Sequence, residues 1–277
     1  MKYLLLFCLG LILLGEVAAQ QVFYELDNPV DVIRSAKVNR ELIYTYPRNK
    51  DSILTASILY DSLGNETEKK LTKAWGFAEG FTTHGYTYNT SGKILKMIEE
   101  NKSNKTFQTA EFEYDEAGNE TASYHYNKDT TSLHIRQKKY NSSNQLIEET
   151  IKIDNNDAFV SRRYYYDDGH KLIKEEVLDP YKNITFSYIY EYDTLANKKT
   201  IYLDNVQGKK IESAVFYNDD NLCIKKLSAE NGKSVTGMDE LNETREFIYN
   251  PDKTLFEFNI YIDGRKRQTN RHYYFKN

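Results

Sequence analysis

The chain has 277 residues and a formal net charge of −4, and it contains 24 tyrosines and 13 phenylalanines. This length suits one large domain or two small ones. The acidic balance excludes a nucleic-acid-binding surface, which would be basic, and the aromatic content excludes a disordered chain, because disordered segments are poor in aromatic residues.

Residues 1–19 are typical of a cleaved export signal. Lys2 supplies the positive start, Leu4–Leu14 is the apolar core, and Val17 and Ala19 are the small residues that a signal peptidase reads. The core is too short for a membrane-spanning helix, which needs about 20 apolar residues, and no later stretch is long enough. Cys8 lies inside the core, so lipid attachment is not expected. We therefore predict a secreted or periplasmic protein that is not a lipoprotein.

Residues 20–41 form an N-terminal segment ahead of the main domain. The stretch NPVDVIRSAKV, Asn28–Val38, predicts a short helix, because Asp27 or Asn28 can cap it and Pro29 suits its first turn. The main domain, residues 42–277, is predicted to be a β-sheet built from repeats.

The repeat is an alternating aromatic stretch, then a tyrosine followed by Asp or Asn, then a polar turn. Its tyrosines, here called the key tyrosines, are Tyr60, Tyr88, Tyr114, Tyr140, Tyr166, Tyr192, Tyr217 and Tyr249. They are spaced by 28, 26, 26, 26, 26, 25 and 32 residues. A constant spacing of about 20–50 residues indicates a repeat architecture.

Each unit predicts two strands and two turns. Apolar residues alternate ahead of the key tyrosine, as Phe112 does with Tyr114, and alternation is the strand pattern. The fourth residue after it, such as Gly118, tolerates positive φ, which a hairpin turn of this kind requires. This turn pairs the key tyrosine with the residue six positions later, Glu120 for Tyr114. We expect the tyrosine rings to form the packed face while their hydroxyls stay in water.

The predicted fold is all-β: an antiparallel meander of two-strand hairpin units of about 26 residues each. With LIYTY (Leu42–Tyr46) and the final QTNRHYYF, the units give about 18 strands. We expect them to form one long curled or open-shell sheet, because open sheets rarely exceed about 10 strands without curling.

These residues resemble the YD-repeat of the RHS family, which has a Tyr-Asp step, a following Gly and then an aliphatic position. FEYDEAGNET and YTYNTSGKILK match closely, whereas YDTLANKK and YNPDKTLF lack the Gly. The resemblance covers nearly all of residues 58–277. It implies an extracytoplasmic protein whose long sheet curls into a shell, and it links the chain to carbohydrate binding, cell-surface contact and toxin delivery. The chain would be a short secreted member without a toxin domain.

No catalytic, cofactor-binding or metal-ligating pattern stands out in the sequence. The five histidines show no ligand spacing, and no nucleophile or phosphate-binding motif is present. The one candidate ligand site is Ala74–Tyr86, where Trp75, Phe77 and Phe81 lie beside glycines and could form a stacking platform for a sugar. The alternative interpretation is a packed turn between the first two units.

The sequence thus predicts a non-enzymatic, extracytoplasmic binding or surface-interaction module, with a glycan or cell-surface polymer as candidate partner. The alternative is a scaffold or remnant of a toxin-delivery shell that acts with other subunits. No cofactor, nucleic acid or transmembrane span is expected.

Overall fold

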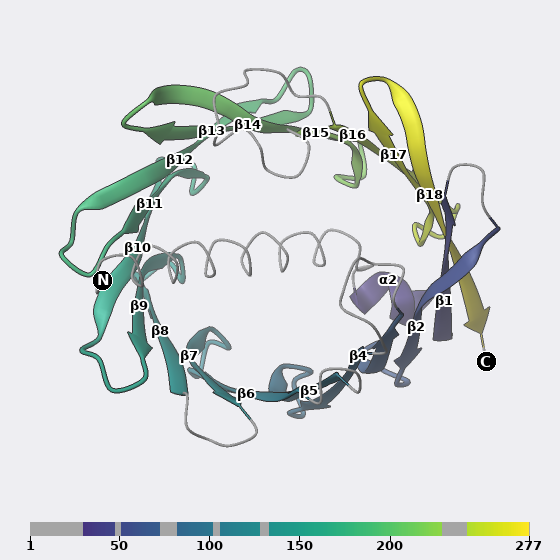
Figure 1. Ribbon diagram of the computed structural model, residues 1–277, viewed down its shortest axis with the longest axis horizontal. Coiled ribbons are helices and arrows are strands. Elements are labelled where there is room, and N and C mark those ends of the chain that lie inside the picture. The colour runs from purple at the N-terminus through teal and green to yellow at the C-terminus, as the bar shows by residue number, and fades with distance from the viewer. Residues whose placement is uncertain are drawn as a thin grey trace.

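The computed structural model describes residues 30–47, 51–72, 82–101, 106–127, 133–228 and 243–276, which form one short helix and 18 strands (Figure 1). The predicted signal peptide lies outside the described residues, as do Trp75, Phe77 and Phe81. No helix in the described ranges is long and apolar enough to cross a membrane.

The helix α2 (Val30–Ser35) lies within the segment where a short helix was predicted, but the sheet begins before residue 42. Lys37 adopts a positive φ of 53° after the helix and turns the chain into the first strand. The strands are β1 (Val38–Pro47), β2 (Ile53–Tyr60), β3 (Glu66–Leu71), β4 (Thr82–Tyr88), β5 (Ile94–Asn101), β6 (Thr106–Tyr114), β7 (Glu120–Asn127), β8 (Leu133–Tyr140), β9 (Leu146–Ile153), β10 (Phe159–Tyr166), β11 (Leu172–Leu178), β12 (Ile184–Asp193), β13 (Lys198–Asn205), β14 (Gly208–Tyr217), β15 (Cys223–Ser228), β16 (Glu243–Tyr249), β17 (Leu255–Ile262) and β18 (Arg265–Lys276).

The sheet closes into a barrel. Each strand pairs antiparallel with the next one in the chain, and β18 pairs with β1 from Val38↔Lys276 to Pro47↔Gln268. The antiparallel meander of about 18 strands is therefore confirmed, whereas the predicted curled or open-shell sheet is wrong. With 18 strands about 4.8 Å apart and tilted by about 40°, the backbone radius is about 18 Å.

The predicted register holds in seven of the eight units. Tyr114 pairs with Glu120 and Tyr166 with Leu172, as expected. The other five that agree are Tyr60↔Glu66, Tyr88↔Ile94, Tyr140↔Leu146, Tyr217↔Cys223 and Tyr249↔Leu255. Tyr192 instead pairs with Lys199, because its turn is one residue longer and places positive φ at Asn197.

Each of the seven regular units carries a β-bulge beside its key tyrosine. In the third unit Glu113 pairs with Ala122 but Tyr114 pairs with Glu120, so the returning strand has one extra residue there. Bulges bend a strand and increase its twist. Their repetition around one rim supplies the curvature that brings β18 to β1.

The turn geometry was also predicted correctly. Gly118 has a φ of 81°, Gly118 N donates to Asp115 O at 3.0 Å, and Asp115 N donates to Asn119 O at 2.9 Å. His170 and Lys253 occupy the same turn position without being glycine, with φ of 65° and 66°. Such non-glycine residues in the left-handed region are uncommon, and the repeated hairpin holds them there.

Replacing Gly118 by valine should destabilise the barrel by about 1 kcal/mol or more, because a β-branched residue resists positive φ. Space is not the cause, since an added Cβ would lie 3.6 Å from Lys93 Cε. Gly85→Val is the matched control: Gly85 lies within β4, and a Cβ there meets nothing within 4 Å. Urea unfolding midpoints that fall equally for both variants would contradict the turn assignment.

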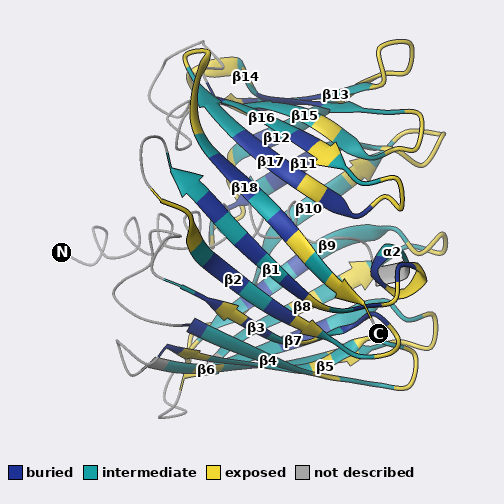
Figure 2. Ribbon diagram, turned by 90° about the vertical axis from the view of Figure 1, so that its right-hand side faces the viewer, coloured by how far each residue is buried: buried dark blue, intermediate teal, exposed yellow. Residues whose placement is uncertain are grey.

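The register sorts the side chains of the strands onto two walls. Residues directly opposite each other on antiparallel strands point to the same side. The helix α2 lies inside the ring (Figure 1), where its Ile33 belongs to a buried cluster that packs against Tyr60 and Tyr274. The key tyrosines therefore point into the lumen, and the alternate residues form the outer wall. Buried and half-buried positions accordingly alternate along β1 from Glu41 to Tyr46 (Figure 2).

Candidate functional site: the barrel lumen

A ladder of tyrosine hydroxyl bonds runs around the inner wall at one rim. Tyr114 Oη donates to Ile94 O at 2.8 Å, and Ile94 is the residue that pairs with the key tyrosine of the preceding unit, Tyr88. The same bond joins Tyr88 to Glu66 O, Tyr140 to Glu120 O, Tyr166 to Leu146 O, Tyr192 to Leu172 O, Tyr249 to Cys223 O and Tyr274 to Leu255 O. The expectation that these hydroxyls stay in water is wrong, because they satisfy carbonyls beside the bulges.

The ladder tyrosines remain protonated donors. Burial, followed by the charge of Glu120, raises the pKa of Tyr140 to about 12. Burial likewise raises the pKa of Tyr249 above its ordinary value. These seven tyrosines thus tie their strands to the preceding unit by a neutral hydrogen bond in addition to the strand ladder.

The inner wall is rich in apolar and aromatic side chains. Phe247 and Phe258 stack with ring centroids 5.1 Å apart, and Leu255 completes their cluster. A second buried cluster joins Ile43, Ala56, Ile58 and Leu71, which also belong to the inner wall by register. Further inward-facing residues are Phe112, Ile151, Tyr164, Phe186, Tyr188, Tyr190, Ile201, Leu203 and Val215.

The inner wall also carries ion pairs, Lys138–Glu120, Arg162–Glu175 and Arg245–Glu243, and the outer wall carries charges on most of its strands. Lys96 on β5 lies 3.0 Å from Glu111 on β6, and both side chains are more than a third exposed. Other outer-wall pairs are Lys70–Glu68, Arg163–Glu148, Lys174–Glu176, Lys209–Glu191 and Arg271–Glu257. Lys209 also lies over the ring of Tyr202, 4.0 Å from its centroid.

The charged outer wall differs from that of transmembrane barrels, which present an apolar band outward. A lysine or arginine facing lipid at the middle of a bilayer costs about 2–4 kcal/mol. The outer-wall pairs on β3, β5, β6, β9 and β10 would incur this cost repeatedly, whereas in water they are solvated.

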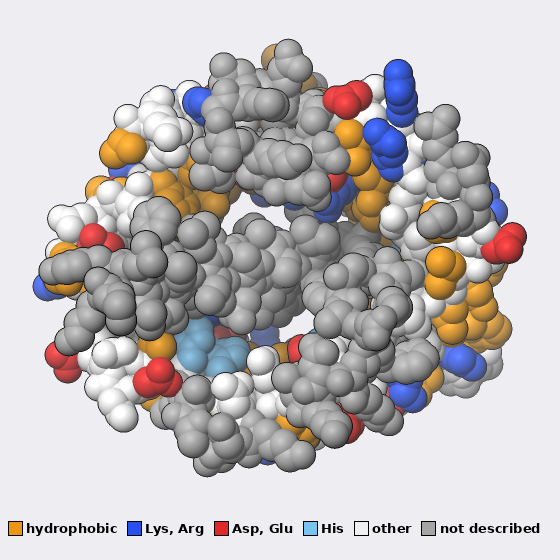
Figure 3. Space-filling view, viewed as in Figure 1, with side chains coloured by type: hydrophobic (Ala, Val, Ile, Leu, Met, Phe, Trp, Pro, Cys, Tyr) orange, Lys and Arg blue, Asp and Glu red, His pale blue; other side chains and the backbone are white. Residues whose placement is uncertain are grey.

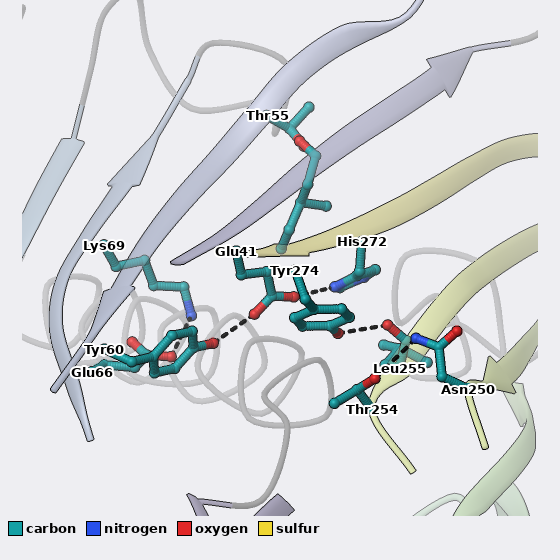
Figure 4. A network of polar contacts seen from close by, with 11 residues as sticks. Glu41, Thr55, Tyr60, Glu66, Lys69, Asn250, Thr254, Leu255, His272 and Tyr274 are labelled. Carbon is teal, nitrogen blue, oxygen red and sulfur yellow. Dashed lines mark hydrogen bonds and ion pairs between the residues drawn. The ribbon is translucent and has the colours of Figure 1, made fainter. Parts of the chain in front are cut away.

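The seam between β1 and β18 carries a buried polar network (Figure 4). Glu41 on β1 accepts hydrogen bonds from Tyr60 Oη, at 2.5 Å, and from His272 Nδ1 on β18. Glu41 and His272 are both almost fully buried. Thr45 Oγ1 donates to Asn270 Oδ1 at 2.5 Å across the same seam. At this seam Tyr60 bonds a carboxylate in place of the main-chain carbonyl used in the ladder.

Glu41 is held as a carboxylate. Burial alone would raise its pKa, but the hydrogen bond and charge of His272, the bond from Tyr60 and the charge of Lys69 outweigh burial and keep the pKa below its ordinary value. The other ring nitrogen of His272, Nε2, has no hydrogen-bond partner among the described residues. Among the described residues of the seam, no hydroxyl or thiol bonds to His272, so this histidine has no nucleophile there to activate.

The other lumenal histidines lie on β4, β7 and β8. His84 Nδ1 is 3.8 Å from Glu99 Oε2, while His125 and His134 lie opposite each other with ring centroids 5.2 Å apart. Burial, followed by nearby cations, lowers the pKa of each of the three to about 4. The cations are Lys69 for His84, Arg136 and Lys138 for His125, and Arg136 for His134.

These shifts predict a loss of stability in mild acid. The unfolded chain takes up protons on these histidines below its ordinary pKa of about 6.5, while the folded barrel resists protonation until about pH 4. Their contribution is therefore complete above pH 6.5 and is lost as pH falls from 6.5 to 4. Chemical unfolding midpoints between pH 4 and 8 should show this slope. A variant with His84, His125 and His134 all replaced by glutamine should flatten it, and an unchanged slope would contradict the assignment.

No three His, Cys, Asp or Glu side chains gather in the described ranges in a way that could hold a metal ion. The histidines brought together by the hairpin β7–β8 were missed by the sequence analysis. The sequence contains no linear ligand motif for this pair. It can be recognised only from the register of that hairpin, which places His134 opposite His125, nine positions earlier.

Comparison with known proteins leaves the family open. No family model and no curated protein matches the chain. Among solved structures, it is similar to a porin-like protein from Bacteroides uniformis ATCC 8492, with 9% sequence identity, coverage of 86% of this chain and 98% of that chain, and a TM-score of 0.42. At this identity and score the likeness carries no functional argument, and membership of the YD-repeat family remains a prediction.

The closed barrel corrects the function predicted from the sequence. A surface-interaction module of open sheet, and a shell remnant that assembles with other subunits, both require a free edge or an open concave face. Because β18 pairs with β1, every strand of the described sheet has a paired neighbour on both sides, and no open edge is left. The binding module, its glycan partner and the toxin-shell alternative are therefore wrong, and the working surface is sought in the lumen.

Proposed function

We propose that the chain is an exported barrel of the cell envelope that works through its lumen, enclosing an apolar or amphipathic molecule away from water. The observation that carries the proposal is an outer wall covered by ion pairs around a lumen where apolar clusters lie among charged groups such as Arg162 and Glu175. Phe247, Phe258 and the tyrosine face line the inside, whereas ion pairs such as Lys96–Glu111 cover the outside. Residues 1–19 predict export, and we place the protein in the cell envelope without choosing a compartment within it. We assign no reaction.

Two properties of the barrel support this function. Large barrels enclose cavities, and ligand sites combine aromatic walls with a few polar groups. The inner wall supplies both, because aromatic rings such as Tyr188 and Phe186 lie among ionisable residues such as Glu175. Gln108, which faces the lumen by register, is also exposed, so the inner wall is not packed shut at that point.

A second candidate function is a conducting pore, and it is favoured by the closed ring of 18 strands, a size at which barrels leave an aqueous channel. A pore requires the outer wall to face lipid. The charged pairs on that wall disfavour this arrangement.

Neighbouring positions on β5 can test both functions. Met97 faces the lumen and Ile98 faces outward, and both are half-buried. In a Cys223→Ser background, a fluorophore on Met97→Cys should be quenched by the methyl ester of a nitroxide-labelled fatty acid in detergent-free buffer, while one on Ile98→Cys should not.

The outcomes separate the candidates. Quenching at position 97 alone supports enclosure in the lumen. Quenching at position 98 by nitroxide lipids of liposomes, together with ion conductance, would replace enclosure by the pore. No quenching at either position would overturn the proposed function.

A further inference from the structure

A group of basic side chains lines one sector of the inner wall on β7 and β8. His125 and His134 are cross-strand partners, and Arg136 on β8 points to the same side, opposite Ser123. Figure 3 shows histidine side chains on the lumen wall, reached from the open end of the barrel. Arg136 Nε donates to His134 Nε2 at 3.2 Å, and His125 Nε2 lies 3.3 Å from Ser123 Oγ. We call His125, His134 and Arg136 the basic sector.

The basic sector differs from the other lumenal histidines in what it faces. His84 lies beside Glu99, and His272 bonds Glu41, so each of these two rings has a carboxylate partner. His125 and His134 have each other and a guanidinium instead. A histidine pair beside an arginine therefore suits a negatively charged group that comes from a ligand in the lumen.

Within the described ranges, the carboxylates on the strands around the sector form no ion pair with its three side chains. On β6 the inward neighbours of His125 are Ala110 and Phe112, whose ring meets the imidazole edge-on at 6.4 Å. On β9 the residues opposite His134 and Arg136 are Ile153 and Ile151. The charged residues next to the sector on the same face are Lys138, its partner Glu120 at 2.9 Å, and Glu149, which lies opposite Lys138 on β9 and opposite Arg162 on β10. Among the described residues, no carboxylate forms an ion pair with Arg136.

We propose that the basic sector binds the anionic head of the enclosed molecule, a carboxylate or phosphate monoester, while its apolar tail lies along the aromatic inner wall. This rests on the proposed function and names its ligand class as an anionic amphiphile. Arg136 provides charge-assisted donors suited to a two-oxygen head. His125 and His134 add N–H donors, and Phe112 begins the apolar surface beside them.

Binding is coupled to proton uptake. In the empty barrel, burial and then the neighbouring cations Arg136 and Lys138 hold the pKa of His125 at about 4, and the same causes act on His134, for which Arg136 is the cation. An anion beside the two rings favours their charged forms and raises both values. Affinity for an anionic head therefore rises as pH falls from about 7 toward 5, whereas affinity for a neutral head does not.

The test compares ligands that share one tail and differ in the head. The full exported chain, labelled at Met97→Cys, is titrated with a nitroxide-labelled fatty acid, its methyl ester and the corresponding alkyl phosphate, at pH 7 and pH 5.5. We expect the two anions to bind about ten-fold more tightly than the ester, a difference of about 1.4 kcal/mol, with the gap widening at pH 5.5. The carboxylate and phosphate arms identify which head fits better.

Variants then assign the effect to the sector. Arg136→Gln should lower anion affinity about ten-fold and leave the ester unchanged, and His125→Gln with His134→Gln should abolish the pH dependence. Arg163→Gln on the outer wall and His84→Gln in another sector are matched controls that should change neither. If ester and anions bind equally, or if Arg136→Gln weakens both alike, the basic sector is not a head-group site although enclosure stands. If no ligand binds, the proposed function itself fails.

Discussion

Replacing His272 by alanine should destabilise the barrel by about 3–5 kcal/mol, because the change leaves the buried Glu41 carboxylate without the ring N–H that donates to it. Only the hydrogen bond from Tyr60 and the more distant charge of Lys69 would remain on that carboxylate. Since Glu41 and His272 join β1 to β18, the loss falls on the seam that closes the ring. Equilibrium unfolding in urea, followed by tryptophan and tyrosine fluorescence, measures the change.

Two further variants check the cause. Glu41→Leu combined with His272→Leu should recover much of the loss, because a buried ion pair replaced by apolar residues is often neutral or stabilising. His170→Asn, in an exposed turn with positive φ, is the matched histidine control and should be close to neutral. A single His272→Ala variant as stable as the parent protein would show that the seam does not depend on this pair.

Replacing Phe258 by alanine should cost about 3–5 kcal/mol, the usual loss for a buried aromatic residue. Phe258 is 2% exposed and stacks on Phe247 with an interplanar angle of 20°. The removed ring would leave a cavity in the inner wall between β16 and β17, and the rigid register of those strands limits collapse around it.

Phe256→Ala on the same strand is the control for this variant. Phe256 is 38% exposed and lies outside the buried cluster that contains Phe258. Its loss should change the free energy of unfolding by no more than about 1 kcal/mol. Thermal melts in which the two variants lose equal stability would contradict the assignment of Phe258 to a buried cluster of the inner wall.

The repeat allowed the hairpins to be predicted residue by residue, because their register depends on local turn chemistry. Gly118 and Asn144 take the predicted positive φ, and Tyr114 and Tyr140 pair as expected. The unit at Tyr192 departs from the pattern since it has Ala196 where other units have a residue able to take positive φ.

Closure of the sheet could not be predicted in the same way. It depends on pairing between β1 and β18, which are more than 200 residues apart, as the bond from Thr45 to Asn270 across 225 positions illustrates. No local pattern records that contact. It becomes favourable only when the summed twist and bulges of all the hairpins bring the two edge strands together.

The lumenal site was hidden for a related reason. His125 and His134 are apart in sequence and become neighbours through the β7–β8 pairing, and whether they face a lumen or solvent is decided by closure. The sequence analysis placed the key tyrosines on one face, which is the inner wall, but they are only half-buried there and Tyr192 is exposed. It assigned function to Trp75, Phe77 and Phe81, which lie outside the described residues.

The tyrosine ladder implies that this architecture can change size in whole steps. Six of the eight key hydroxyls bond the unit immediately before them, as Tyr166 does with Leu146 and Tyr140 with Glu120, so these units present the same acceptor to the unit that follows. Loss or duplication of one repeat in the gene would remove or add two strands while keeping every internal junction intact. The seam of Glu41 and His272 would still join the ends. Lumen diameter is thus set by copy number, and selection can alter it in increments of about 4 Å per repeat without redesigning the unit.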